Sequence, residues 1–193
     1  MIDKNRNPIH ISTDRFRKLV HDIHDIDCNQ NYDKTLPYSF HLKAVEAQYD
    51  KFKHLLPSSD KFTYHSDLDS IRAACILHDS IEDARMTWND VYEFCLKYTD
   101  NPTLADLTAD TIYNLTDEKG KGRKERKNDK YYRELKNNKY AVYIKLADIA
   151  ANTLYSKLTN SKKYKMYKTE FKMFKAKTFK VEYTEFFDYV ESL

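Results

Sequence analysis

The sequence predicts an all-α protein, and three of its features carry that prediction. Apolar residues recur every three or four positions through most of the chain, as they do on one face of a helix. The 193 residues include only 2 Gly and 4 Pro, too few for the tight turns of hairpin-rich folds. No stretch alternates apolar and polar residues as a strand does. We therefore expect one compact helical bundle, a single domain over residues 1–193.

The first half of the chain is expected to form helices separated by polar segments. Ser12 can cap the first helix, and Pro57 stops the second. The third helix is apolar on nearly every face, so it is expected to run through the core. Thr87, followed three positions later by Asp90, matches a capping box that opens the fourth helix. These expected helices cover roughly residues 13–26, 41–56, 68–78 and 88–98.

The second half is expected to add further helices around a basic loop. Asn101-Pro102-Thr103 starts one helix, which runs to Leu115. Both glycines of the chain lie between Asp117 and Arg123, which predicts a loop, and a basic helix follows it. Another apolar helix extends from Lys139 to Leu158, and one or two aromatic helices complete the chain. Their aromatic residues, Tyr164 and Tyr167 among them, are expected mainly to pack in the core, with a role as a stacking residue as the alternative.

Composition excludes several classes of protein. With 2 Gly, the chain cannot build the glycine-rich phosphate loops of Walker or dinucleotide-binding proteins. It has no apolar run of the roughly 20 residues that a bilayer span needs, and the polar segment Met1–Pro8 lacks the core of a signal peptide. We therefore expect a cytoplasmic protein without a membrane partner. The odd number of cysteines, 3, favours buried thiols over disulfides.

Charge is distributed unevenly along the chain. Residues 119–139 hold ten Lys and Arg against three Asp and Glu, whereas residues 1–118 hold 13 against 21. This asymmetry suggests an anionic partner for the basic stretch. The alternatives are a solvated helix or a weak nucleic-acid patch, and nucleic acid is not the expected partner.

All seven histidines lie within the first 78 residues, and three of them precede an aspartate. His21-Asp22 and His24-Asp25 lie on an amphipathic helix, where a solvated face is expected. His78-Asp79 differs because it ends an apolar helix, and burying these groups is costly without a partner such as a metal. Glu82 and Asp83 follow, and on one further helical turn they would face the same cleft.

A second polar group lies within an apolar helix. Asp148 follows Ile144-Lys145-Leu146-Ala147, and Asn152 lies one turn later on the same face. Aspartates are rarely buried without a partner. His41, at the start of the second expected helix, supplies a further imidazole. These residues predict a site assembled from distant parts of the chain.

In chain order, these residues resemble the HD-domain phosphohydrolases, in particular the hydrolase domain of the RelA/SpoT enzymes and the small stand-alone alarmone hydrolases of the metazoan SpoT-homologue type. The shared order is a histidine, a His-Asp pair followed closely by Glu-Asp, and an aspartate with an asparagine four positions on. The resemblance covers most of residues 12–158 and implies an HD-type domain, with helices in residues 161–192 packed on it. The matching segments are Pro37-Tyr38-Ser39-Phe40-His41, Leu77-His78-Asp79-Ser80-Ile81-Glu82-Asp83, Thr87 to Val91, Leu115-Thr116-Asp117-Glu118-Lys119 and Ile144-Lys145-Leu146-Ala147-Asp148.

The resemblance implies a metal centre that holds one divalent ion, usually Mn²⁺ in these hydrolases. Two nitrogens and two oxygens suit manganese, iron or zinc better than magnesium, and leave positions open for water and substrate. Manganese is the expected ion, with iron or zinc as alternatives. The residues that the resemblance assigns to the ion are His41, His78, Asp79 and Asp148.

The resemblance also implies a reaction, the hydrolysis of the 3′-pyrophosphate of (p)ppGpp-like alarmones, the nucleotides of the stringent response, to give GDP or GTP and pyrophosphate. It assigns Glu82 and Asp83 to catalysis and Asn152 to the ribose region of the nucleotide. Basic residues after Asp117, where the family also places positive charge, would bind the phosphates. The basic residues concerned are Lys119, Lys121, Arg123, Lys124, Arg126 and Lys127, and the substrate-binding prediction rests on Lys119, Arg123 and Lys124.

Three departures from the family keep other substrates open. The basic run that precedes Pro-Tyr in the family is Asn29–Lys34 here, with one lysine. The His-Pro of the family is His41-Leu42, and the basic residue after the metal-binding aspartate is Ile149. An HD phosphohydrolase acting on an adenine alarmone, NADPH or nucleoside phosphates therefore remains an alternative. A further alternative is a non-enzymatic protein that binds RNA or another protein through residues 119–139.

Overall fold

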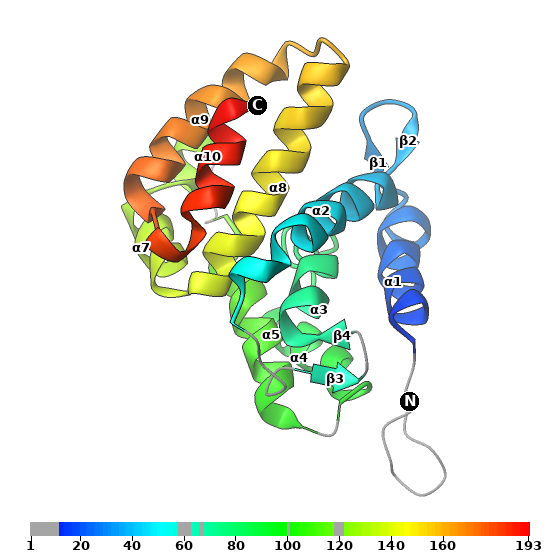
Figure 1. The fold of residues 1–193 in the computed structure, drawn as a ribbon. Helices are drawn as coiled ribbons and strands as arrows, with labels where there is room; N and C mark the ends of the chain where they lie inside the picture. Colours follow the sequence, from blue (N-terminus) through cyan, green and yellow to red (C-terminus); the bar gives the residue numbers. More distant parts are fainter. Residues whose placement is uncertain (1–11, 58–62, 66–67, 100, 118–121) are drawn as a thin grey trace, which may run out of the picture.

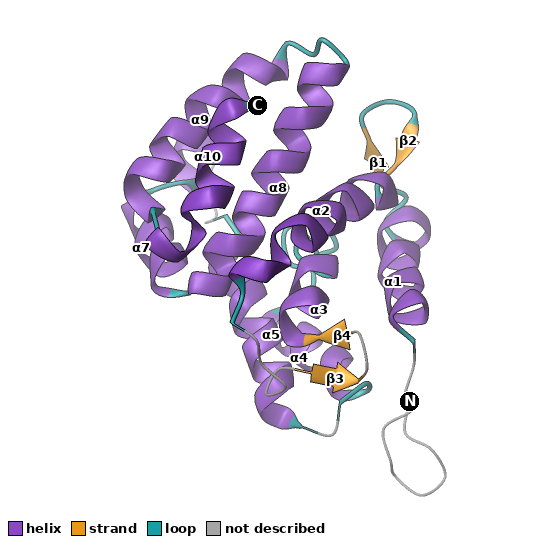
Figure 2. Cartoon of the chain, viewed as in Figure 1, coloured by secondary structure: helices purple, strands orange, loops and turns teal. Residues whose placement is uncertain are grey.

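The computed structural model is helical through most of the residues it describes, which confirms the all-α class (Figures 1 and 2). The described residues are 12–57, 63–65, 68–99, 101–117 and 122–193. The helices are Thr13–Asp22 (α1), Ser39–Phe52 (α2), Ser70–Ile76 (α3), Trp88–Leu96 (α4), Pro102–Leu115 (α5), Arg123–Arg126 (α6), Asp129–Asn137 (α7), Lys139–Leu158 (α8), Lys163–Thr178 (α9) and Thr184–Ser192 (α10).

Short polar side chains begin several of these helices, and the caps at Ser12 and Thr87 are those that the sequence predicts. The Ser12 hydroxyl accepts a hydrogen bond from the N–H of Arg15 at the start of α1. Thr87 and Asp90 form the predicted capping box of α4. Asn138 caps the long helix α8 by accepting from two backbone N–H groups. Such caps satisfy N–H groups that have no partner within their own helix.

Two short antiparallel ladders interrupt the helices, and the sequence analysis did not predict them. Strands Asn31–Tyr32 (β1) and Leu36–Pro37 (β2) form a hairpin that contacts the start of α2. Strands Thr63–His65 (β3) and Leu68–Asp69 (β4) form the second ladder. Strands this short contain no more than one alternation of apolar and polar residues, so no strand period is visible in the sequence.

Helix α8 lies at the centre of the packing (Figure 1). It contacts α2 and α5 along part of its surface and α7, α9 and α10 elsewhere, while α3 packs against both α2 and α5. The rings of Phe52 in α2 and Phe186 in α10 stack with centroids 4.0 Å apart, which joins the C-terminal helix to the same core. Among the described helices, none has the length and apolarity needed to cross a bilayer.

Local structure departs from expectation at two places near the histidines. Helix α1 continues into a π-helical turn, Ile23–Asp27, in which His24 is fully buried against Tyr38. The expected solvated face is therefore wrong for His24, because the π-helical turn directs its ring towards the start of α2. Helix α3 ends at Ile76, so the His78-Asp79 pair lies on the turns that follow it and not on the helix itself.

The prediction of buried thiols is confirmed for two of the three cysteines. Cys75 and Cys95 are buried, Cys28 is exposed, and none of these three thiols is in a disulfide within the described part of the chain. Burial in apolar surroundings raises the pKa of the Cys75 thiol well above its usual value. Such a thiol contributes to the core and is not a reactive nucleophile.

Candidate metal centre

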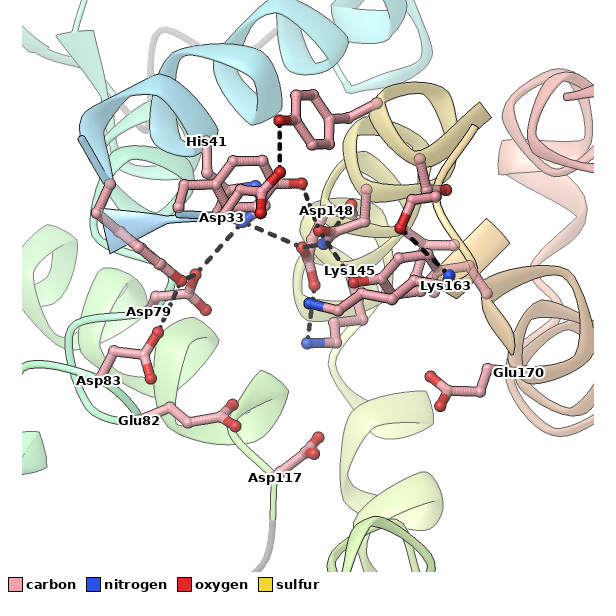
Figure 3. Close-up of a pocket in the computed structure, with 18 of the residues that line it drawn as sticks. Asp33, His41, Asp79, Glu82, Asp83, Asp117, Lys145, Asp148, Lys163 and Glu170 are labelled. Atoms are coloured by element: carbon pink, nitrogen blue, oxygen red, sulfur yellow. Dashed lines mark hydrogen bonds and ion pairs between the residues drawn. The ribbon is translucent and has the colours of Figure 1, made fainter. Parts of the chain in front are cut away.

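Three segments that are far apart in the sequence bring the four predicted metal ligands together, and Figure 3 shows three of them, His41, Asp79 and Asp148. His41 lies in the first turn of α2, Asp148 in the middle of α8, and His78 and Asp79 directly after α3. Helices α2, α3 and α8 pack against one another, so folding of the core creates the site. Each of the four residues is at most 7% exposed.

The two imidazoles point towards each other. The Nε2 atoms of His41 and His78 lie 3.3 Å apart. Two nitrogens bound to one ion at about 2.1 Å, with an angle of roughly 90–110° at the ion, would be about 3.0–3.4 Å apart. The spacing therefore fits two ligands of the same ion.

Two carboxylates complete the cluster. Oδ2 of Asp79 lies 2.9 Å from Nε2 of His78 and 3.4 Å from Nε2 of His41. Oδ1 of Asp148 lies 3.3 Å from the same His41 nitrogen. The donor atoms of His41, His78 and Asp79 all lie within 4.8 Å of one another, and Asp148 joins them through His41. The set offers two nitrogens and two oxygens, as the sequence analysis expected.

The two histidines are held in different ways. Nδ1 of His78 lies 3.0 Å from the carbonyl oxygen of Cys75. A carbonyl only accepts, so this bond places the proton on Nδ1 and leaves the Nε2 lone pair facing the cluster. Nδ1 of His41 is buried and has no hydrogen-bond partner among the described residues.

Without a metal ion, the buried carboxylates of Asp79 and Asp148 are paired with the positively charged side chains of His41 and Lys145. Burial disfavours charge on His41, but hydrogen bonds to Asp148 and Asp79 outweigh it and raise the pKa of this imidazole to about 9. Burial likewise opposes the charge of Asp148, yet Lys145 and His41 hold the pKa of that carboxyl well below its usual range. A proton on His41 thus neutralises charge where a divalent cation would do so more completely. The donor chemistry and the excess of negative charge both fit a metal ion.

Glu82 and Asp83 lie on the turn after the His-Asp pair. They are not part of α3, which ends at Ile76, but the Asp83 N–H donates to the carbonyl of Asp79 at 2.8 Å, the four-residue bond of a single helical turn as expected. That turn directs both side chains into the same cavity (Figure 3). The Tyr38 hydroxyl bridges Oδ2 of Asp79, at 2.5 Å, and Oδ2 of Asp83, at 2.7 Å. Tyr38 therefore ties one expected catalytic carboxylate to one expected metal ligand.

Glu82 has the electrostatic character of a group that can exchange a proton. Burial raises the pKa of its carboxyl, Lys145 opposes that shift, and the nearby charge of Asp117 adds to it. The carboxylate also forms an ion pair with Arg126, with Nη1 and Oε1 3.1 Å apart. Figure 3 shows Glu82 and Asp117 close together on one side of the cavity.

A cavity of about 500 Å³ opens beside the cluster and is lined by His41, Asp79 and Asp148. Asn152 lines it, and its Nδ2 donates to Oδ1 of Asp148 at 2.5 Å, so the predicted neighbour relationship within α8 is present. Tyr32 and Tyr155 also line the cavity, from the β1–β2 hairpin and from α8. Tyr167 lines it too, in contrast to the core packing expected for it, because it faces Asn152 and not the interior, with its hydroxyl 3.5 Å from Oδ1 of Asn152.

Among the basic residues whose side chains the structure describes, two reach the cavity. Lys119 lies outside the described residues, and Arg123 and Lys124 belong to α6 but their side chains are not described. Arg126 and Lys127 line the cavity, and Nζ of Lys127 lies 3.2 Å from Oε2 of Glu170 in α9.

The sequence analysis gave no role to several residues that meet at the site. Tyr38 and Lys145 lie inside the matching segments, and the three-residue spacing of Lys145 and Asp148 could have predicted their ion pair. Tyr32 carried no such signal, since its contact with Asn152 joins residues 120 positions apart. Only folding brings these two together.

The arrangement defines a buried His/Asp centre that opens onto a cavity with carboxylates and cations on its walls. Comparisons of the chain with protein-family models, with curated proteins and with solved structures gave no match.

Proposed function

We propose that this protein is a metal-dependent phosphohydrolase that removes the 3′-pyrophosphate of (p)ppGpp-like alarmones and gives GDP or GTP and pyrophosphate. One observation carries the proposal. Four side chains converge beside the carboxylates of Glu82 and Asp83, and all of them except His78 line a cavity of about 500 Å³. The four are His41, His78, Asp79 and Asp148. That volume lies within the range of small-molecule sites.

The proposed site holds one divalent cation, Mn²⁺ by preference, with Fe²⁺ or Zn²⁺ as alternatives. His41, His78 and Asp79 would hold it through donor atoms that lie within 4.8 Å of one another, and Asp148 would hold it through the Oδ1 that faces His41. When bound, such an ion lowers the pKa of a coordinated water and polarises a phosphoryl oxygen. His78 is prepared for this role because its Nδ1 proton is held by the carbonyl of Cys75.

Glu82 and Asp83 would orient the attacking water and take up its proton. The raised pKa of Glu82 makes this carboxylate a stronger base than an exposed one. Asp83 is fixed by the hydroxyl of Tyr38, which also contacts the metal ligand Asp79. The water-activating groups and the ligands would therefore keep a constant separation during turnover.

Cations on the cavity wall would bind the phosphates. Lys145 is buried and charged, because the neighbouring Asp148 outweighs the cost of burial. Arg126 and Lys127 lie on the same cavity, each paired with a carboxylate. A polyphosphate entering the cavity would compete with Glu82 and Glu170 for these cations.

A second substrate class is favoured by aromatic and apolar residues of the cavity wall. Tyr32, Tyr155, Tyr167 and Ile149 line it. Tyrosine rings offer stacking surfaces that accept any base, and Ile149 offers no hydrogen bond. An adenine alarmone, NADPH or a nucleoside phosphate is therefore the alternative substrate.

The test uses the full chain, stripped with a chelator and reloaded separately with Mn²⁺, Fe²⁺ or Zn²⁺. Each form is incubated with ppGpp, pppGpp, an adenine alarmone, NADPH, GTP and ATP, and the products are separated and identified. We expect pyrophosphate and GDP from ppGpp with Mn²⁺, and loss of both metal and activity in Asp148→Asn. Asp106→Asn, which changes an exposed aspartate of α5, serves as the matched control.

Three outcomes would count against the proposal. Hydrolysis of another nucleotide with ppGpp untouched would support the alternative substrate class. Equal metal content in the wild type and Asp148→Asn would contradict the metal centre. Tight RNA binding that weakens steeply with salt, with every nucleotide left intact, would favour the non-enzymatic alternative.

A further inference from the structure

We propose that Tyr32, on the β1–β2 hairpin, is a positioning residue of the metal centre. It orients the ring of His41 by stacking and the carboxylate of Asp148 through Asn152. The inference rests on the proposed metal centre and goes beyond it, because it assigns part of the ligand geometry to a hairpin that supplies no ligand.

His41 lacks a hydrogen bond that a metal-binding histidine usually makes. A histidine that binds a metal through one nitrogen usually donates from the other, and that second bond fixes the ring. His78 has this bond, to the carbonyl of Cys75. Nδ1 of His41 is buried with no hydrogen-bond partner among the described residues. On its Nδ1 side, the His41 ring must therefore be held by something other than a hydrogen bond.

The ring of Tyr32 covers one face of the His41 imidazole. The phenol of Tyr32 lies over the imidazole with centroids 4.9 Å apart and an angle of 12° between the planes. Tyr38 and His78 contact the same imidazole edge-on, at 68° and 63°. In the part of the chain that the structure describes, Tyr32 is thus the ring parallel to His41. A parallel contact on its face resists tilting of the imidazole.

The hydroxyl of Tyr32 connects it to a second expected ligand. It donates to Oδ1 of Asn152 at 2.9 Å, and Nδ2 of Asn152 donates to Oδ1 of Asp148 at 2.5 Å. The first bond fixes which end of the Asn152 amide faces the aspartate, because only the NH₂ end can donate. Tyr32 therefore contacts one expected ligand directly and a second through one intermediate residue.

The hairpin itself is tied to the same helix. The Tyr155 hydroxyl donates to Oδ2 of Asp33 at 3.0 Å, and the rings of Tyr155 and Tyr32 meet edge-on with centroids 5.0 Å apart. Movement of the hairpin away from α8 would separate Tyr32 from both His41 and Asn152. Ligand geometry is accordingly linked to the position of residues 31–37.

The test measures Co²⁺ binding by the full chain, with the dissociation constant and the visible d–d absorption as readouts. Tyr32→Leu removes the stack and the hydroxyl, whereas Tyr32→Phe keeps the stack and loses only the bond to Asn152. Tyr113→Leu, at a half-exposed tyrosine of α5, is the matched control. Thermal unfolding with chelator present shows whether each variant is folded.

We expect Tyr32→Leu to bind Co²⁺ about 10–100-fold more weakly, with altered band positions or intensities. Tyr32→Phe should recover most of the affinity and the spectrum, and Tyr113→Leu should match the wild type. A folded Tyr32→Leu with the affinity and spectrum of the wild type overturns this inference while the metal centre stands. A wild-type chain that binds no Co²⁺ overturns the proposed function and this inference together.

Discussion

Nζ of Lys145 lies 3.0 Å from Oδ2 of Asp148, one turn later on helix α8, while Oδ1 of the same carboxylate faces Nε2 of His41 at 3.3 Å. Asp148 therefore lies between a buried ammonium group and an imidazole. Burial of such charges is costly unless each has a partner, so these three residues depend on one another energetically. The charge balance that makes the site suitable for a cation is also part of the stability of the fold.

Replacing Asp148 with Asn should destabilise the metal-free protein by about 3–5 kcal/mol, because Lys145 loses its partner in the interior. Urea denaturation followed by circular dichroism measures the change in the free energy of unfolding. The double variant Lys145→Met, Asp148→Asn should recover part of the loss, since no unpaired ammonium remains. Strictly additive effects of the two substitutions would contradict the coupling.

Metal binding should strengthen as the pH rises. The pKa of His41 is raised to about 9 in the folded, metal-free chain, from about 6.5 in an unfolded one. Its proton therefore stabilises the metal-free fold fully below a pH of about 6.5, and this contribution is lost as the pH rises towards about 9. An ion must displace that proton, so apparent affinity should rise about tenfold per pH unit in this window.

The measurement is the increase in melting temperature that saturating Mn²⁺ produces, recorded from pH 6 to pH 9 in steps. The increase should grow with pH across this range. A metal-induced shift that is independent of pH, or one that falls as the pH rises, would show that His41 is not protonated in the metal-free site.

Lys127 and Glu170 should have opposite effects on substrate binding. Lys127→Gln removes a cation from the cavity wall and should raise KM several-fold for a polyphosphate substrate, because a charge-assisted contact is lost. Glu170→Gln removes the carboxylate that pairs with Lys127 at 3.2 Å and should lower KM. Steady-state kinetics at two salt concentrations test this pair of variants. Changes of the same sign in both would indicate a structural role for the ion pair.

Phe186→Ala should destabilise the chain by about 3–5 kcal/mol, as expected for removal of a fully buried phenyl ring. Its ring stacks on Phe52 at 4.0 Å and so links α10 to α2, the helix that carries His41. Differential scanning calorimetry should show one transition in both proteins, at a lower temperature in the variant. Two separate transitions in the wild type would mean that the C-terminal helices unfold independently.

The helices were predictable because each has a local signal. The cap at Ser12, the capping box of Thr87 and the apolar period of α8 lie within a few residues of the structure that they specify. The convergence of His41, His78, Asp79 and Asp148 was expected from their buried settings and from a resemblance, and the structure places these four side chains together. The end of α3 before His78 was not predicted, since no proline or glycine marks it.

By itself, the sequence determined that the chain is helical and that imidazoles and carboxylates are placed in or beside apolar helices, where they need partners. The hydrophobic period and the burial that it implies depend on residues that are close together in the chain, so the sequence is enough to reveal them. Only the tertiary structure decided which partners meet: Tyr32 over His41, Tyr38 between Asp79 and Asp83, and Tyr167 beside Asn152. These contacts join residues that are far apart in the sequence, and they depend on how whole helices and a two-stranded hairpin pack. The geometry of such side chains therefore follows from the packing of the complete core.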